Sequence, residues 1–216
     1  MPQKIIIVNK VRGQCFFYFE ISKNKVLKRG VRFDITIEGW EESNMRVTVK
    51  TERLILRPLV PEDYEAAFQW CGDPKVNTYM IYPLYHKAED VKKWLESRNL
   101  DDPDDYDLGL VLKETGELIG SGGFVYDPEK DVWTVGYNIR ADQWGKGLVP
   151  EAMQGLLDFI RKTRKVSAIE GTFAKENYKS QRVMEKLGMH YVCDTEYEKL
   201  DGSEKFEARL FRKDFT

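Results

Sequence analysis

The 216-residue chain has few cysteines and no long apolar run. Its three cysteines, Cys15, Cys71 and Cys193, are far apart, and no pair has the C-x-x-C spacing. This pattern argues against a disulfide framework or a zinc site, so we expect buried or partly buried free thiols and no metal site. No apolar segment approaches the roughly 20 residues of a membrane span, and no basic segment followed by an apolar one opens the chain. We therefore expect a cytoplasmic protein with no membrane partner.

The chain also lacks an excess of charge of either sign. It has 34 Lys and Arg against 36 Asp and Glu, for a formal net charge of −2. This balance gives no electrostatic reason to expect a nucleic-acid partner. Hydrophobic residues at 42% and charged residues at 32% are typical of an ordinary globular protein. The length suits one domain with a full core, with or without an appendage.

Residues 1–44 differ in charge from the remainder, because they hold eight basic and five acidic residues. Short apolar clusters among them are compatible with strands. The codons for Trp40-Glu41-Glu42 must be TGG followed by two GAR codons, which contain a purine run of the kind that recruits bacterial ribosomes, shortly before Met45. We hypothesise that Met45 is the natural start, that residues 1–44 are an upstream extension, and that residues 45–216 form the domain. Mass spectrometry of the protein made in its own cell tests this, since abundant peptides from residues 1–40 would refute it.

Strand and helix patterns alternate after Met45. We expect strands at 51–59, 106–113, 118–126, 132–140 and 166–173, helices at 61–71, 88–98, 150–163 and 177–187, and two last strands around the Asp201-Gly202 turn. Short turns join the three strands between 106 and 140, so these strands should form an antiparallel meander. In the helix at 150–163, Met153, Leu156, Leu157 and Ile160 should face a core.

The most informative stretch runs from Trp144 to Pro150 and joins the strand at 132–140 to the helix at 150–163. Its glycines, Gly145 and Gly147, let the backbone approach a ligand closely. The unpaired N–H groups of a first helical turn, with the positive end of the helix dipole, favour an anion. Pro150 suits the first helical position, where its missing N–H would have had no partner inside the helix. The turn is therefore a candidate seat for a ligand that carries phosphate.

Four motifs occur in order along the chain: Thr51-Glu52-Arg53-Leu54-Ile55-Leu56-Arg57-Pro58-Leu59, then Val135-Gly136-Tyr137, then Trp144-Gly145-Lys146-Gly147, then Asn177-x-x-Ser180-x-Arg182-Val183-Met184-Glu185-Lys186-Leu187-Gly188. Together they resemble the GNAT superfamily of N-acetyltransferases, and most closely the Rim-type branch, whose known members acetylate the N-termini of ribosomal proteins. The resemblance spans about residues 48–213. It implies an α+β, three-layer fold, in which a mixed, mostly antiparallel sheet of about seven strands has helices on both faces.

The resemblance also implies acetyl-CoA as cosubstrate and a primary amine as acceptor, in a protein that is a monomer or a homodimer. The strand at 132–140 should splay from the strand at 166–173, and the pantetheine arm should lie in the gap as an added strand would. Asn138 and Ile139 are then assigned to the pantetheine and the thioester. The diphosphate is assigned to Trp144, Gly145, Lys146, Gly147, Leu148 and Val149. Ordinary strand pairing and a plain loop-to-helix connection are the structural alternatives.

The sequence departs from the family's pattern at positions that bear on mechanism. The phosphate turn usually starts with Gln or Arg and ends with Gly or Ala, whereas this chain has Trp144 and Val149. The Rim-type pattern Glu-Ile-Gly-Tyr, whose Glu is a proposed general base, reads Thr134-Val135-Gly136-Tyr137 here. The tyrosine acid of many superfamily members aligns with Met184. The usual base and the usual tyrosine acid are therefore both missing.

Ser180 matches the serine that Rim-type enzymes are thought to use to protonate the leaving thiolate. A thiol with a pKa of about 8.5 is a tolerable leaving group near neutral pH, so a positioned hydroxyl could suffice. Asn177, which the family places near the pantetheine, is equally suited to cap the helix, and Ser180 is common in a first helical turn. Both interpretations stay open at the level of sequence.

The acceptor is less defined than the cosubstrate. Without the usual Glu, an α-amine with a pKa of about 7.7–8 is favoured over a lysine side chain near 10.4, because more of it is already neutral. Residues 79–86 and the Asp201-Gly202 hairpin should border the acceptor, although their aromatics could equally be core packing. His86 is a tempting base, but a lone loop histidine is more often structural or exposed.

Two other functions compete with an active acetyltransferase. A dinucleotide oxidoreductase could use Gly145-x-Gly147 with Glu170 on a ribose, but Pro150 occupies the place of the third glycine and the preceding strands resemble hairpins. No G-x-x-x-x-G-K-[ST] motif occurs, so a P-loop is not supported. Thr134 and Met184 motivate the second alternative, a catalytically weak GNAT-like domain that binds acyl-CoA as a sensor or interaction module.

Overall fold

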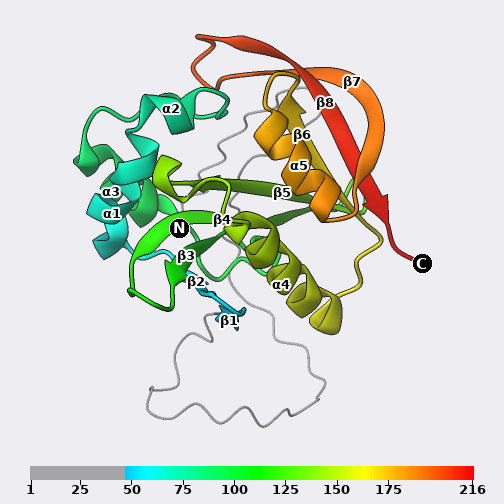
Figure 1. Cartoon of the computed structure of the whole chain (residues 1–216), viewed down its shortest axis with the longest axis horizontal. Coiled ribbons are helices and arrows are strands. Elements are labelled where there is room, and N and C mark those ends of the chain that lie inside the picture. Colours follow the sequence, from blue (N-terminus) through cyan, green and yellow to red (C-terminus); the bar gives the residue numbers. More distant parts are fainter. Residues whose placement is uncertain (1–46) are drawn as a thin grey trace, which may run out of the picture. The chain divides into compact units, whose positions relative to one another are not determined.

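The computed structural model describes residues 47–216, and their strands form one sheet with helices on both faces (Figure 1). The strands are β1 Val49–Lys50, β2 Leu54–Pro58, β3 Leu108–Leu112, β4 Leu118–Asp127, β5 Val132–Ile139, β6 Ala168–Ala174, β7 His190–Glu198 and β8 Lys205–Asp214. The helices are α1 Tyr64–Cys71, α2 Pro74–Asn77, α3 Ala88–Ser97, α4 Leu148–Thr163 and α5 Tyr178–Lys186, with short 3₁₀ helices η1 Pro61–Asp63 and η2 Ala141–Gln143. The hypotheses on residues 1–44 and on the start at Met45 lie outside the described residues.

The sheet confirms the predicted architecture. Its strand order is β1-β2-β3-β4-β5-β6-β8-β7, and the neighbours β3, β4 and β5 form the expected antiparallel meander. The pairing of β5 with β6 is parallel, which makes the sheet mixed but mostly antiparallel. The described sheet has eight strands rather than about seven, because the two residues of β1 pair with β2.

Two apolar cores lie on opposite faces of the sheet. α4 and α5 cover one face, where Met153, Leu156, Leu157 and Ile160 of α4 are buried as predicted. Each such side chain contributes about 1.5–3 kcal/mol by leaving water. α1 and α3 pack on the other face through a second cluster that includes Trp70 of α1. The sheet, and with it Asn138 and Ile139 on β5, is therefore supported from both sides.

Two local features differ from the sequence analysis. The short helix α2 was not predicted, although Asp73 caps it by accepting a hydrogen bond from Lys75 N (2.8 Å). Cys71 is buried as expected, but the prediction for Cys193 is wrong, because its side chain is exposed on β7. β7 is an edge strand of the sheet and is exposed along most of its length, which a single sequence does not reveal. Cys15 lies outside the described residues.

Within the described part of the chain, no helix is long and apolar enough to cross a membrane.

Candidate active site

β5 and β6 separate after a short stretch of parallel pairing. Trp133 and Thr134 pair with β6, whereas β5 stays paired with β4 as far as Ile139. Within residues 47–216, residues 135–139 therefore have a strand partner on one edge only. Gly136 is exposed, and a Cβ atom added there would meet nothing within 4 Å. The predicted divergence of the two strands is thus present, and the free edge of β5 is accessible to an added extended segment.

The turn between β5 and α4 adopts a conformation that requires glycine. Gly145 and Gly147 both have φ of +76°, in the left-handed region that other residues avoid. Gly147 is the N-cap of α4, and the helix begins at Leu148. Pro150 is therefore the third helical residue and not the first, so the predicted start is wrong by two residues. A left-handed glycine starts this helix without a capping side chain, and the proline marks only its first turn.

The first turn of α4 presents main-chain donors. The first hydrogen bond within α4 runs from Glu151 N to Gly147 O, at 3.3 Å. The N–H groups of Leu148 and Val149 lie before it and therefore have no carbonyl partner within the helix. The side chains of Leu148 and Val149 are buried in the core. Any contact these two residues make with an anion must therefore come from the main chain, at the positive end of the helix dipole.

Trp144 connects the turn to β5 and to α5. Its Nε1 donates a 3.0 Å hydrogen bond to Ile139 O, and Lys179 Nζ lies 3.5 Å from its ring centroid. A cation over an aromatic face is attracted by the ring quadrupole, so this contact holds a positive charge beside the turn. The sequence analysis did not select Lys179, although it precedes Ser180 in the same motif. Asn138, on the other hand, accepts a 3.2 Å hydrogen bond from the Ser121 hydroxyl through its side-chain oxygen.

Asn177 and Ser180 begin α5. The Asn177 side chain accepts a 3.2 Å hydrogen bond from Ser180 N, which confirms its role as the N-cap. The Tyr137 hydroxyl donates a 3.3 Å hydrogen bond to the main-chain oxygen of Ser180. Burial raises the pKa of Tyr137 well above its usual range, although a hydrogen bond with the Ser180 side chain acts in the opposite direction. Sequence reasoning missed this phenol, whose only signal was its place in the Val-Gly-Tyr motif.

Thr134 and Met184, which stand where the family usually has its base and its tyrosine acid, supply neither group. Met184 is buried, and its Cε would lie 2.4 Å from a Cβ atom at Gly171, so it fills space that only a glycine leaves. Thr134 pairs in register with Glu170 of β6. The sequence analysis considered this carboxylate only as a ribose ligand in the oxidoreductase alternative. Arg212 Nη1 donates a 2.6 Å hydrogen bond to Glu170 Oε1, so this carboxylate is already engaged in an ion pair.

The two segments predicted to border the acceptor contact each other. The Tyr197 hydroxyl, on the strand that leads into the Asp201-Gly202 hairpin, donates a 2.7 Å hydrogen bond to Tyr79 O. Burial raises the pKa of Tyr197, so it stays a neutral donor near pH 7. The rings of residues 79–86 also serve packing, because Tyr82 and Tyr85 pack against the core cluster of α1 and α3, and the Tyr79 ring meets Phe206 edge-on at 5.9 Å. His86 is exposed in its loop.

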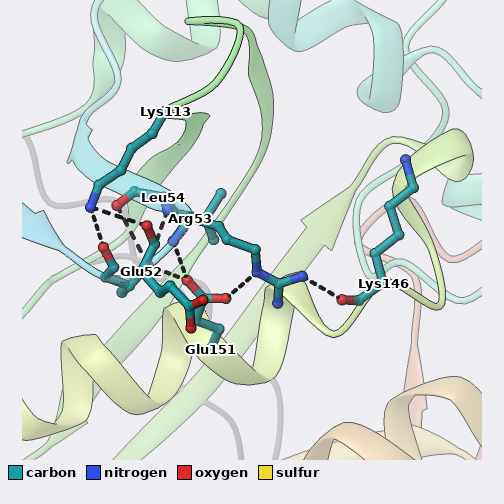
Figure 2. A network of polar contacts seen from close by, with 7 residues as sticks. Glu52, Arg53, Leu54, Lys113, Lys146 and Glu151 are labelled. Atoms are coloured by element: carbon teal, nitrogen blue, oxygen red, sulfur yellow. Dashed lines mark hydrogen bonds and ion pairs between the residues drawn. The ribbon is translucent and has the colours of Figure 1, made fainter.

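Arg53 and Glu151 join the glycine turn to the loop between β1 and β2 (Figure 2). Arg53 Nη1 donates a 2.9 Å hydrogen bond to Lys146 O, and Arg53 Nε donates a 2.6 Å bond to Glu151 Oε2. Glu151 Oε1 also accepts hydrogen bonds from Arg53 N at 2.7 Å and from Thr51 Oγ1 at 2.6 Å. Lys113 Nζ donates to Thr51 O on the other side of this loop. The sequence contained Arg53 in a recognised motif but did not indicate that it reaches α4.

Glu151 gives this network a pH dependence. Desolvation acts to raise the pKa of its carboxyl, but the hydrogen bonds from Thr51 and Arg53 outweigh it, so the pKa lies below the usual 4.5. A carboxyl with a lowered pKa in the folded state stabilises the fold above its unfolded pKa, and this stabilisation is lost as pH falls through the folded pKa. The free energy of unfolding of Glu151→Gln should therefore be lower than that of wild type at pH 7, and the difference should shrink as pH falls below 4.5.

Urea titrations from pH 7 to pH 3.5 measure this difference. Glu52→Gln, which alters an exposed carboxylate in the same network region, is the matched control and should track wild type throughout. A gap between Glu151→Gln and wild type that stays constant over the whole pH range would contradict the role of the charged carboxylate.

Comparison with known proteins agrees with this geometry. The acetyltransferase (GNAT) domain family matches residues 53–190. The uncharacterized N-acetyltransferase p20 of Bacillus licheniformis is 33% identical over 144 residues, which cover 65% of this chain and 80% of p20. The microcin C7 self immunity acetyltransferase MccE, solved with acetyl-CoA and AMP, superposes with a TM-score of 0.65 at 19% identity, over 76% of this chain and 93% of its own.

RimL, a ribosomal L7/L12 alpha-N-protein acetyltransferase solved with coenzyme A, has a TM-score of 0.67 at 16% identity, over 78% of this chain and 98% of its own. At these identities the two solved structures establish a common fold, whereas the domain match and p20 establish kinship. The chain therefore belongs to the GNAT family of acetyltransferases and is an N-acetyltransferase.

Proposed function

We propose that the protein transfers the acetyl group of acetyl-CoA to a primary amine by direct attack within a ternary complex. One observation carries this proposal. The glycine turn directly follows β5, the strand that separates from its parallel neighbour β6, so a candidate anion-binding turn lies next to an unpaired strand edge. The diphosphate binds at the main chain of residues 144–149, and the pantetheine runs along β5 toward Asn138 and Ile139. The ligands of MccE and RimL, which share the fold, support this choice of cosubstrate.

The chemistry follows from the groups that border this path. A main-chain N–H of β5 polarises the thioester carbonyl and stabilises the oxyanion that forms when the amine attacks, an effect typically worth a few kcal/mol. The new C–N bond forms, the C–S bond breaks, and Ser180 donates a proton to the departing thiolate. Asn177 caps α5 and so holds Ser180 in its first turn, next in sequence to Lys179, whose ammonium lies over the Trp144 ring.

The amine loses its proton to water, because Thr134 offers no carboxylate and Glu170 is held by Arg212. The pH dependence should therefore belong to the acceptor. Below the acceptor's own pKa, kcat/KM rises about tenfold per pH unit, toward a plateau near pH 8 for an α-amine and above pH 10 for a lysine. Profiles measured with a peptide carrying a free N-terminus, and with its N-blocked analogue carrying one lysine, check this. One shared pKa for both acceptors would instead indicate a base on the enzyme.

The acceptor class we favour is a protein N-terminal α-amine, with small-molecule amines as the other candidates. Release of thiol from acetyl-CoA, followed across a panel of peptide N-termini, polyamines and amino acids, tests both the activity and the acceptor. The buried Met184 and the missing base at Thr134 favour one alternative, an acyl-CoA-binding module with little catalysis. Binding of acetyl-CoA without turnover on every acceptor would support that alternative.

A further inference from the structure

We propose that Arg53 is a positioning residue for the cosubstrate, because it fixes the direction of the peptide group between Lys146 and Gly147. This inference rests on the proposed function, since it takes the turn as the seat of the acetyl-CoA diphosphate. Arg53 reaches the turn from the loop between β1 and β2, 93 residues earlier in the chain (Figure 2).

A peptide group is planar and trans, so its C=O and N–H point in opposite directions. Arg53 Nη1 donates to the carbonyl of Lys146 at 2.9 Å, and Figure 2 shows the Lys146 side chain extending away from this contact. The N–H of Gly147 is therefore directed away from the guanidinium. That N–H immediately precedes those of Leu148 and Val149, so the three can face one anion together.

The turn needs such an external restraint. Gly145 and Gly147 lie on either side of Lys146, and glycine populates both signs of φ about equally, so neither residue resists rotation of the intervening peptides. Without a partner for Lys146 O, the Gly147 N–H would sample several directions. Its ordering would then have to occur when the ligand binds, at the expense of affinity.

Arg53 is itself held in place. Glu151, in the first turn of α4, accepts from both Arg53 Nε and Arg53 N, and Thr51 donates to the same carboxylate. The Arg53 side chain is 45% exposed and that of Glu151 is 17% exposed. The Arg53 Nε–Glu151 Oε2 ion pair has this much solvent contact and by itself adds little to global stability, so the stabilisation expected of the Glu151 carboxylate comes mainly from its hydrogen bonds with Thr51 and Arg53 N. The main consequence of the ion pair is therefore the geometry of the turn, and removal of Arg53 should affect cosubstrate binding more than folding.

Arg53→Met tests this, because methionine keeps an apolar stem but removes both donors. The KM for acetyl-CoA should rise about tenfold, the factor expected from losing one charge-assisted hydrogen bond, while kcat and the KM for the amine change by less than about twofold. Arg57→Met is the matched control. Arg57 lies on β2 and donates to both carboxylate oxygens of Asp63 rather than to the turn, so its loss should leave the KM for acetyl-CoA unchanged.

Calorimetric titration with coenzyme A and with pantetheine, which lacks the diphosphate, adds a readout besides activity. Arg53→Met should weaken binding of coenzyme A about tenfold and leave binding of pantetheine unchanged. Arg53→Lys, which keeps the charge but cannot reach both partners at once, should fall between wild type and Arg53→Met.

The possible results separate this inference from the proposed function. If wild type binds coenzyme A no better than pantetheine, the turn does not bind the diphosphate and the proposed function fails. If wild type prefers coenzyme A and Arg53→Met keeps the full preference, only the role of Arg53 is refuted. Equal weakening of both ligands in Arg53→Met would indicate general loss of structure and would also overturn the inference.

Discussion

Replacement of Ser180 by alanine is expected to lower kcat at least tenfold while leaving the affinity for acetyl-CoA nearly unchanged. A positioned general acid typically contributes 10²–10⁴-fold, but a thiol with a pKa near 8.5 leaves with less help, which sets the lower bound. Binding should be spared because we propose that the diphosphate contacts lie in the turn between β5 and α4, and because Asn177 still caps α5 through the main-chain N–H of residue 180. Thiol release gives kcat, and calorimetry gives the dissociation constant.

Ser97→Ala is a matched control, since this serine lies at the end of α3 and donates to Trp94 O away from the site. Its kcat should equal that of wild type. Unchanged turnover in Ser180→Ala would remove Ser180 as the acid. Tyr137→Phe would then decide whether the phenol beside Ser180 acts instead, although burial makes that phenol a poorer acid.

Gly145→Val is expected to weaken acetyl-CoA binding at least tenfold. Gly145 has φ of +76°, a conformation that costs an L-residue roughly 1–2 kcal/mol and a β-branched residue more. A Cβ atom at this position would meet nothing within 4 Å, so a clash between that atom and the protein does not explain the effect. We expect it to come from a turn that abandons its left-handed conformation and no longer presents its N–H groups as the proposed diphosphate site requires. Calorimetric titration with acetyl-CoA measures the change.

Gly116 provides the matched control for this substitution. It has φ of +73° in the turn between β3 and β4, and a Cβ atom there would also meet nothing within 4 Å. Gly116→Val should therefore lose similar stability in thermal unfolding while binding acetyl-CoA as wild type does. Equal weakening in the two variants would attribute the effect to destabilisation and not to the turn.

Much of the fold was predictable because its signals are local. The helix around Met153 to Ile160 follows from apolar periodicity, and the glycine conformations follow from residue type. The N-cap role predicted for Asn177 is confirmed by the hydrogen bond from Ser180 N, whereas its predicted place near the pantetheine stays a prediction. The start of α4 was misplaced because Pro150 is tolerated anywhere in the first turn, where N–H groups lack partners in any case.

The contacts that organise the site were not predictable from one sequence. Arg53 and Lys146 are 93 residues apart, and Tyr137 and Ser180 are 43 apart, so their meeting depends on strand order and register. The ion pair that holds Glu170 and the exposure of β7 depend on the same long-range choices. Even the divergence of β5 from β6 was expected from family resemblance and not from any periodicity.

The central claim is that main-chain amides around Gly145 and Gly147 bind the diphosphate of coenzyme A. Calorimetric titration of the folded wild-type protein with acetyl-CoA tests it most directly. We expect saturable binding at one site per chain that coenzyme A competes for and that Gly145→Val weakens at least tenfold. No heat and no saturable association with folded protein would contradict the account.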